Sequence, residues 1–433
     1  MEIETNDDSR ALCDLPKGSK VDVKHPIFLK DTALENVESN MYQREMLMDS
    51  SISETSISTT RIFPLNTTLH NEDTLAIEHP NNAHSHESAE MTTIPNYKFA
   101  GCNDLKRFVI PKCVTHIGES AFSHSGLKCI EIPESVREIG NSAFGSCFSL
   151  KKAKIPSSVT KLDDFLFSGC NNLKSVKLPN TIRSIGDYAF VDCTNIKRFK
   201  IPENVIIVGN CAFQGCTGLF EMIIPSTVVR LGENWMQGCT AIEDITIPHS
   251  VTFIGESGFS DCSDLKTIKL SNSLREISRN LFTKCESLRI IEIPYEVVNI
   301  GDFAFFGCSS LSNLTLSYRL RRIGKKAFAE CDSIRKVVIP ESVVSIGERA
   351  FWKCKHLTYV ELSSLKIVEN NAFRGCENTI TFIIGDIGDI KTYDDLELYL
   401  YKMGISEVQH VKINHVLKGK SNRIIYSRRT LFL

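Results

Sequence analysis

The sequence predicts a repeat solenoid, in which similar coils of chain stack on one another. Three series of residues carry this prediction, because each recurs every 23 positions in a common register, and such a period is typical of solenoids. Cysteine forms the first series, which runs from Cys147 to Cys354 and is flanked by Cys102 and Cys376. Phenylalanine, replaced once by Met236, stands three residues before each cysteine. Proline, replaced by serine in two coils, forms the third series.

Each repeat is expected to form one coil with one strand. Residues 155–177, IPSSVTKLDDFLFSGCNNLKSVK, show the repeating unit. Apolar and polar residues alternate from 173 to 178, as they do in a half-buried strand. Pro179 ends this segment, because proline has no N–H to donate to a ladder. The other apolar positions lie among turn-like residues, which indicates a compact return path. We therefore expect about 12–13 coils over residues 94–384.

The phenylalanine and cysteine series are interpreted as packing. Phenylalanines in register are expected to stack from coil to coil as an aromatic spine. Each cysteine is expected to be a small buried residue in a tight turn, close enough to the next to crosslink under oxidation. The alternative is a metal-thiolate array or a redox relay. Zinc sites use paired spacings such as C-x-x-C, which none of the 16 cysteines has.

The repeats resemble those of a known family. The runs IPENVIIVGNCAFQGCTGLFEMIIP and IPESVVSIGERAFWKCKHLTYVEL are similar to the leucine-rich repeats of the BspA-like, or Treponema-type, family. The resemblance covers about residues 94–384. It implies a curved, right-handed leucine-rich-repeat solenoid with parallel strands on its concave face. It also implies surface proteins linked to adhesion, or intracellular proteins of unknown role, with no catalytic residues to transfer.

The chain divides into three parts. Residues 1–93 are rich in Ser and Thr and lack a sustained period, so we expect a largely disordered arm before the solenoid at 94–384. Residues 385–433 are expected to form a C-terminal cap, with a helix at 393–402 and a basic tail. The first residues, MEIETNDDSR, lack the basic and apolar regions of a secretory signal, and no apolar run is long enough to span a membrane. We therefore expect a cytoplasmic, reducing location with free thiols, the alternative being the cell surface.

Two other motifs are weak candidates for a metal-binding or phosphate-binding site. His79, His84 and His86 have the residue type of a metal site, but a chance cluster in the arm is the better interpretation. Gly419-Lys420-Ser421 resembles the end of a phosphate-binding loop without its earlier glycine. We expect no cofactor, no metal and no catalytic residues. The formal charge of −2 does not favour nucleic acid as a partner.

The exposed side of the strands is the candidate binding face. Side chains alternate along a strand, so the residues on either side of the inner apolar position point away from the core. In three consecutive coils these positions are mainly basic: Lys152, Lys154, Lys177, Arg198 and Lys200. An anion-seeking patch for an acidic protein segment is one interpretation. The other is a solvated face on which Lys and Arg keep the sheet soluble. Cys129 is expected to lie on the same face as the most accessible thiol of the repeats.

The function predicted from these features is binding. We expect a non-catalytic scaffold for protein–protein interaction that holds a partner on the concave face. A cell-surface adhesin exported without a standard signal is the alternative. A third hypothesis is an enzyme or enzyme regulator whose active part lies in residues 385–433, although so few residues are a thin basis for a catalytic core.

Overall fold

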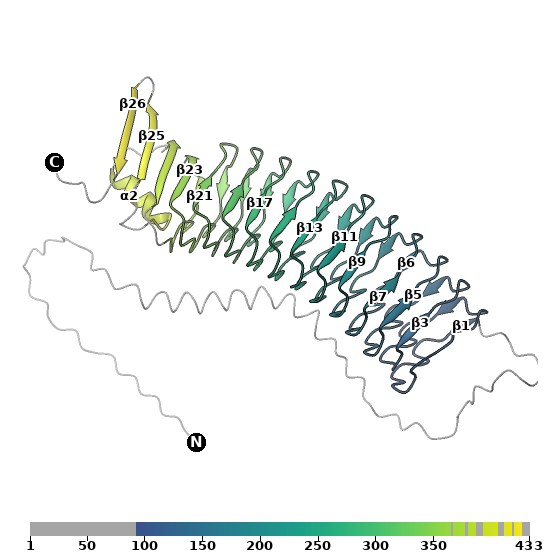
Figure 1. Ribbon diagram of the computed structural model, residues 1–433. Coiled ribbons are helices and arrows are strands. Elements are labelled where there is room, and N and C mark those ends of the chain that lie inside the picture. Colours follow the sequence, from purple (N-terminus) through teal and green to yellow (C-terminus); the bar gives the residue numbers. More distant parts are fainter. Residues whose placement is uncertain are drawn as a thin grey trace, which may run out of the picture. The chain divides into compact units, whose positions relative to one another are not determined.

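The computed structural model describes residues 92–364, 367–376, 380–386, 393–405, 411–417 and 420–426. The arm expected at 1–93, except its last two residues, and the three histidines within it lie outside the described residues. From β1 (Thr93–Ile94) onward, the chain winds through coils that stack along a curved solenoid (Figure 1). The predicted repeat solenoid is therefore confirmed. We number its coils 1 to 12. Each coil is identified by the apolar residue that stands two positions before its longer strand or, in coil 1, before the equivalent position: Leu105, Leu127, Leu150, Leu173, Ile196, Leu219, Ile242, Leu265, Leu288, Leu311, Ile334 and Leu357.

One strand of each coil from the second onward belongs to a parallel stack that backbone pairing divides into four sheets, and we call these the ladder strands. They are β3 (Cys129–Glu131), β5 (Lys152–Lys154), β7 (Ser175–Lys177), β9 (Arg198–Lys200), β11 (Glu221–Ile223), β13 (Asp244–Thr246), β15 (Thr267–Lys269), β17 (Ile290–Glu292), β19 (Asn313–Thr315), β21 (Lys336–Val338) and β23 (Tyr359–Ser364). Residues one repeat apart pair directly, as Lys152 does with Ser175. In the three-residue strands the middle side chain points inward, and its neighbours face outward.

Each coil also has a second strand of two residues, so the expectation of one strand per coil is wrong. These return strands are β1, β2 (His116–Ile117), β4 (Glu138–Ile139), β6 (Lys161–Leu162), β8 (Ser184–Ile185), β10 (Ile207–Val208), β12 (Arg230–Leu231), β14 (Phe253–Ile254), β16 (Glu276–Ile277), β18 (Asn299–Ile300), β20 (Arg322–Ile323) and β22 (Ser345–Ile346). They pair in parallel with a 23-residue offset, except that β2 and β4 are 22 residues apart. Two residues are too few for an alternating pattern, which is why the sequence did not reveal them.

The chain beyond coil 12 forms β24 (Thr381–Asp386), α2 (Tyr393–Lys402), β25 (Val411–Leu417) and β26 (Lys420–Tyr426). The helix expected at 393–402 is present, whereas the two last strands were not expected. Strands β24 and β25 extend the ladder in parallel, and β26 closes it in antiparallel (Figure 1). The amides of Asn371 and Phe373 donate to the carbonyls of Lys402 and Met403, 2.8 and 3.0 Å away. Residues after the last coil thus take up its free N–H groups, as a cap would.

The predicted aromatic spine fills the turn side of the coils. Rings one coil apart are stacked with centroids 5.0 to 5.7 Å apart, from Phe99 to Phe213 and again from Phe259 to Phe373. Met236 interrupts the stack, and the neighbouring Trp235 meets Phe259 edge-on at 5.4 Å. Apart from Phe99 at the open end, the phenylalanines of the spine are fully buried. The spine therefore forms the continuous part of the core.

The cysteine series satisfies backbone carbonyls between coils. The Phe167 carbonyl accepts the Cys170 amide of its own coil at 3.1 Å and the Cys193 thiol of the next coil at 3.2 Å. The same thiol-to-carbonyl bond recurs at each cysteine of the series from Cys147 to Cys376. A buried carbonyl gains a second donor in this way, which explains why a small donor occupies the position. Cys102 is exposed, contrary to expectation, because coil 1 has no earlier coil beneath it.

Two glycine positions show how closely the coils approach. A Cβ on Gly255 would lie 2.4 Å from the Glu233 nitrogen of the preceding coil, so a side chain there would force the coils apart. A Cβ on Gly238 would make only ordinary contacts, 3.9 Å from Gly215, but its φ of 71° lies in the left-handed region that favours glycine. One glycine is thus required by contact between coils and the other by the shape of the turn.

Truncation of one ring tests the spine. Phe305→Ala is expected to lower the free energy of unfolding by about 3–5 kcal/mol, because it leaves a cavity between two stacked neighbours. The Phe305 ring lies 5.2 Å from the ring of Phe282 and 5.0 Å from that of Phe328. Urea unfolding followed by circular dichroism measures the change. Tyr318→Ala is the control, because Tyr318 is 80% exposed, and should change stability by less than about 0.5 kcal/mol. Equal effects of the two changes would contradict a packed spine.

Candidate binding face

The outward side chains of the ladder strands and of the residue just before each strand form one surface, which we call the ladder face. Its inner boundary is the buried middle residue of each strand, such as Ile130 or Phe199. Because neighbouring strands pair in register, equivalent side chains form columns that run from coil to coil. Any pattern that repeats in sequence therefore becomes a line on this surface.

The five basic residues singled out in the sequence lie together on this face. Lys152 and Lys154 are on β5, and Lys177 is on the adjacent β7, where it pairs in register with Lys154. Arg198 and Lys200 are the outer residues of β9 in the following coil. All are exposed except Lys154, which is partly covered. The structure thus brings the predicted residues onto three consecutive coils.

Carboxylates neutralise part of this charge. Lys154 pairs with Glu131 at 2.5 Å, Arg198 with Glu221 at 3.0 Å and Lys200 with Glu203 at 2.9 Å. The hydrogen bond and charge of Lys154 hold the pKa of Glu131 below its usual value, and Lys177 adds to this shift. Within the described part of the chain, Lys152 and Lys177 have no ion pair. Two of the five predicted cations are therefore available to an incoming anion without displacing a carboxylate.

A further column of basic residues was missed by the sequence reasoning. It lies one position before the ladder strands in coils 1 to 5, and we call it the lysine column: Lys106, Lys128, Lys151, Lys174 and Lys197. Backbone bonds link the first four in register, since the amide of Lys128 donates to the carbonyl of Lys106 at 3.1 Å, that of Lys151 to Lys128 at 2.9 Å and that of Lys174 to Lys151 at 3.0 Å. All five side chains are exposed. Alignment of the repeats at this position would have revealed the column, but only the two strand positions were considered.

The outward positions of coils 1 to 5 together form a field of almost one sign. Of fifteen such positions, eleven are basic and one, Glu131, is acidic. We call the eleven the basic field: Lys106, Arg107, Lys128, Lys151, Lys152, Lys154, Lys174, Lys177, Lys197, Arg198 and Lys200. The field ends at coil 6, where the same columns carry Phe220 and Glu221, and coil 7 carries Glu243 and Asp244. The Arg198 guanidinium lies over the Phe220 ring at this border, 5.2 Å from its centroid.

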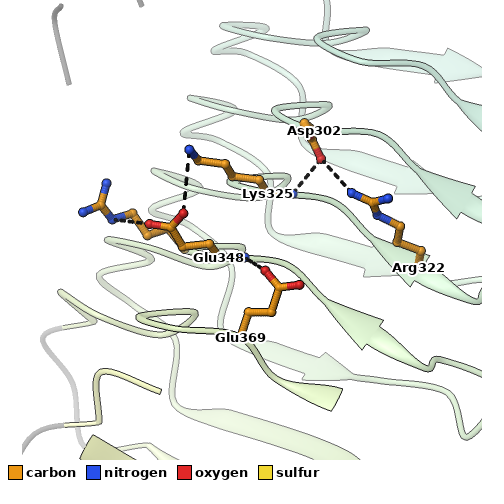
Figure 2. A network of polar contacts seen from close by, with 6 residues as sticks. Asp302, Arg322, Lys325, Glu348 and Glu369 are labelled. Atoms are coloured by element: carbon orange, nitrogen blue, oxygen red, sulfur yellow. Dashed lines mark hydrogen bonds and ion pairs between the residues drawn. The ribbon is translucent and has the colours of Figure 1, made fainter. Parts of the chain in front are cut away.

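Near the later return strands, by contrast, positive and negative side chains lie together. Figure 2 shows Asp302 accepting the Lys325 amide at 2.9 Å and meeting Arg322 at 3.6 Å. In the same view, Lys325 reaches Glu348 at 3.7 Å, and the Glu348 amide donates to Glu369 at 3.0 Å. Cations there alternate with carboxylates, which neutralise them and bind neighbouring coils together. The acid-poor field on coils 1 to 5 is thus a local feature and not a general property of the solenoid.

The buried thiols of the core are unreactive. Burial raises the pKa of Cys216 and of Cys262 to about 12, so both remain protonated at neutral pH. Cys102 and Cys129 are the exposed cysteines of the described chain, and Cys129 lies on the ladder face as expected. The cysteines of the series from Cys147 to Cys354 are free thiols. Among the described residues, no group of three or more His, Cys, Asp or Glu side chains is arranged to hold a metal ion.

The stacked parallel coils define the class of protein as a leucine-rich-repeat solenoid. The family model described as the BspA type leucine rich repeat region matches residues 92–219, 183–298 and 275–394, in six copies. The chain therefore belongs to the BspA-type leucine-rich-repeat family, as its resemblance implied. Comparison with curated proteins gives no match. In the described segments, no helix has the length and apolar character needed to cross a bilayer.

The chain is also similar to proteins of known structure. The chain is similar to a leucine-rich repeat protein from Bacteroides ovatus, with 30% identity over 74% of this chain and 75% of that one, and a TM-score of 0.57. A leucine-rich cell surface protein from Faecalibacterium prausnitzii matches with 26% identity over 68% of this chain and 86% of that one, at a TM-score of 0.46. The leucine-rich repeat protein of T. pallidum matches with 29% identity over 37% and 77% of the two chains, at 0.36.

Thiol labelling tests the burial of the cysteine series. Iodoacetamide is expected to modify Cys102 and Cys129 in the folded protein and to leave Cys216 and Cys262 unmodified, because the thiolate is the reactive form. Raising the pH to about 9 should not change this, since both buried groups have a pKa of about 12. Peptide mass spectrometry measures the modification, and the guanidinium-unfolded protein is the control. Labelling of Cys216 as fast as Cys129 in the folded state would contradict the buried series.

Proposed function

We propose that the protein is a non-catalytic scaffold that binds a partner protein on the ladder face, through an acidic segment of the partner. Proteins of the BspA-type family are in general interaction or surface proteins, and their fold is one of binding surfaces. The observation that carries the proposal is the basic field on coils 1 to 5, with one acidic residue among fifteen outward positions. Complementary charge steers association and rejects partners of the wrong sign.

The arrangement of the field favours recognition over solubility alone. A surface that only needs to remain soluble is served by mixed charges. The later coils of this chain have such a mixture on the same face, as in Lys266 paired with Glu243 at 2.7 Å. Concentration of one sign on neighbouring coils raises the local potential but costs self-repulsion. A bound anionic partner would relieve that repulsion.

A reducing, cytoplasmic location is part of the proposal. A series of free thiols one coil apart, from Cys147 to Cys354, is compatible with a compartment that keeps thiols reduced. The proposal includes no catalytic activity. The ladder face carries repeated charged side chains and not the combination of acid, base and nucleophile that catalysis requires.

Charge reversal tests the binding face. We expect the change of Lys152, Lys154, Lys177, Arg198 and Lys200 to Glu to abolish capture of those proteins from cell lysate that carry acidic segments. The reason is that attraction becomes repulsion at each position. Quantitative mass spectrometry of the captured proteins measures the loss.

The matched control reverses five basic residues of later coils on the same face: Lys266, Lys269, Arg289, Arg335 and Lys336. It alters the net charge equally, so its captured set should resemble that of the unmodified protein. The proposal is wrong if the set of captured proteins is the same for the unmodified protein and both variants.

A further inference from the structure

We propose that the acidic segment recognised by the basic field is an extended peptide that runs along the solenoid axis, across the strands, with about six or more consecutive Asp or Glu residues. This inference rests on the proposed function and specifies the form of the partner. It depends on the lysine column, which adds positions that the strand residues alone do not provide.

The direction follows from how the charge is distributed. Within one coil, the basic positions span only three or four residues of strand. From coil to coil, every coil from the first to the fifth contributes one residue of the lysine column, from Lys106 to Lys197, and basic residues accompany it on one or both strand positions in every coil but the second. A linear polyanion therefore meets the most cations when it lies along the axis. Backbone bonds between coils hold the column in register from Lys106 to Lys174, and Lys197 follows on the next coil.

The length follows from the strand spacing. Neighbouring strands lie about 4.8 Å apart, so the four steps from coil 1 to coil 5 span about 19 Å. An extended peptide advances about 3.3 Å per residue, so about six residues cover this distance. Glu243 and Asp244 follow on coil 7 and would repel a longer acidic run. Phe220 marks the border between attraction and repulsion, where an apolar residue of the partner would fit.

The width of the field favours a single chain over a broad acidic surface. Glu134 and Glu203 lie just beyond the ladder strands of coils 2 and 5 and are exposed, so they border the field along one side. Glu134 is held there by the amide and hydroxyl of Ser157, at 2.9 and 2.7 Å. A wide acidic surface would meet these carboxylates, whereas a narrow chain over the lysine column avoids them.

The same positions disfavour single-stranded nucleic acid. Proteins that bind it stack the bases on aromatic side chains. None of the fifteen outward positions of coils 1 to 5 is aromatic. Nine of the eleven basic residues are lysines, which act as flexible point charges and suit the carboxylates of a mobile acidic run.

A length series of peptides tests the inference on the full-length protein. The probes are fluorescein-labelled peptides with two, four, six, eight or ten consecutive glutamates, measured by fluorescence anisotropy at low salt. Affinity should rise up to about six glutamates and then level off. A peptide with eight glutamates separated by Gly-Ser pairs should bind less tightly, because fewer carboxylates reach the row at once.

The column variant changes Lys128, Lys151, Lys174 and Lys197 to Glu and should weaken binding of the eight-glutamate peptide by about tenfold or more. The control variant changes Lys269, Arg289, Arg335 and Lys336, four exposed residues of the later ladder face, and should leave the affinity within about threefold. Both variants alter net charge equally, so their difference reports position and not total charge.

Three results would overturn the inference. They are an affinity that already levels off at two glutamates, equal weakening by both variants, and tighter binding of a sulfated oligosaccharide or of oligothymidine with the same number of charges. If protein capture still depends on Lys152 and Lys177 while the length series is flat, the partner presents a compact acidic site and the proposed function stands. If neither measurement depends on the basic residues, both proposals fail.

Discussion

Backbone hydrogen bonding between successive coils is the constraint on which the rest of this molecule depends. Successive coils bond to each other in three bands: the ladder strands, which form four sheets, the return strands, which form three, and the turn around the phenylalanine. In the third band the Phe190 amide donates to Ala212 of the next coil at 2.8 Å. A single coil cannot satisfy these groups or bury its apolar side, so stability arises from neighbouring coils together. The common offset of 23 residues keeps all three bands in register.

Because the coils stack in register, equivalent residues of successive repeats form columns, and each column has its own structural role. The phenylalanines stack their rings from coil to coil. The cysteine thiols donate hydrogen bonds to the backbone carbonyls of the phenylalanine turn in the preceding coil. The position of these thiols is explained by the geometry of the turn, and burial keeps Cys262 protonated. On the outside, the same rule aligns lysines of five coils. A structural period therefore creates both the core and a surface suited to an extended partner.

Much of the fold could be predicted from the sequence, because a period of 23 residues identifies equivalent positions without any other information. The spine and the buried thiols followed directly. The return strands did not, since two residues give no alternation, and neither did β25 and β26, which lie beyond the repeats. Cys102 is exposed because the first coil has nothing beneath it, which a repeat pattern does not express.

The candidate site was only partly predictable. The strand positions of Lys152 and Lys177 followed from alternation of side chains, but their freedom from carboxylates depends on contacts between coils. Glu131 and Glu221 neutralise Lys154 and Arg198 from neighbouring coils, one repeat away in sequence. The lysine column lies just outside the strands, where alternation gives no prediction. Three-dimensional register was needed to recognise it as one feature.

The most direct test of the central role of register is the removal of one whole repeat. Deletion of residues 255–277, which joins Ile254 to Ser278, keeps every later coil in phase. Circular dichroism and urea unfolding should show a solenoid with unchanged ellipticity per residue and cooperative unfolding. Deletion of residues 255–265 alone breaks the phase and should abolish cooperative unfolding. If the two deletions destabilise the protein to the same extent, register is not the controlling constraint.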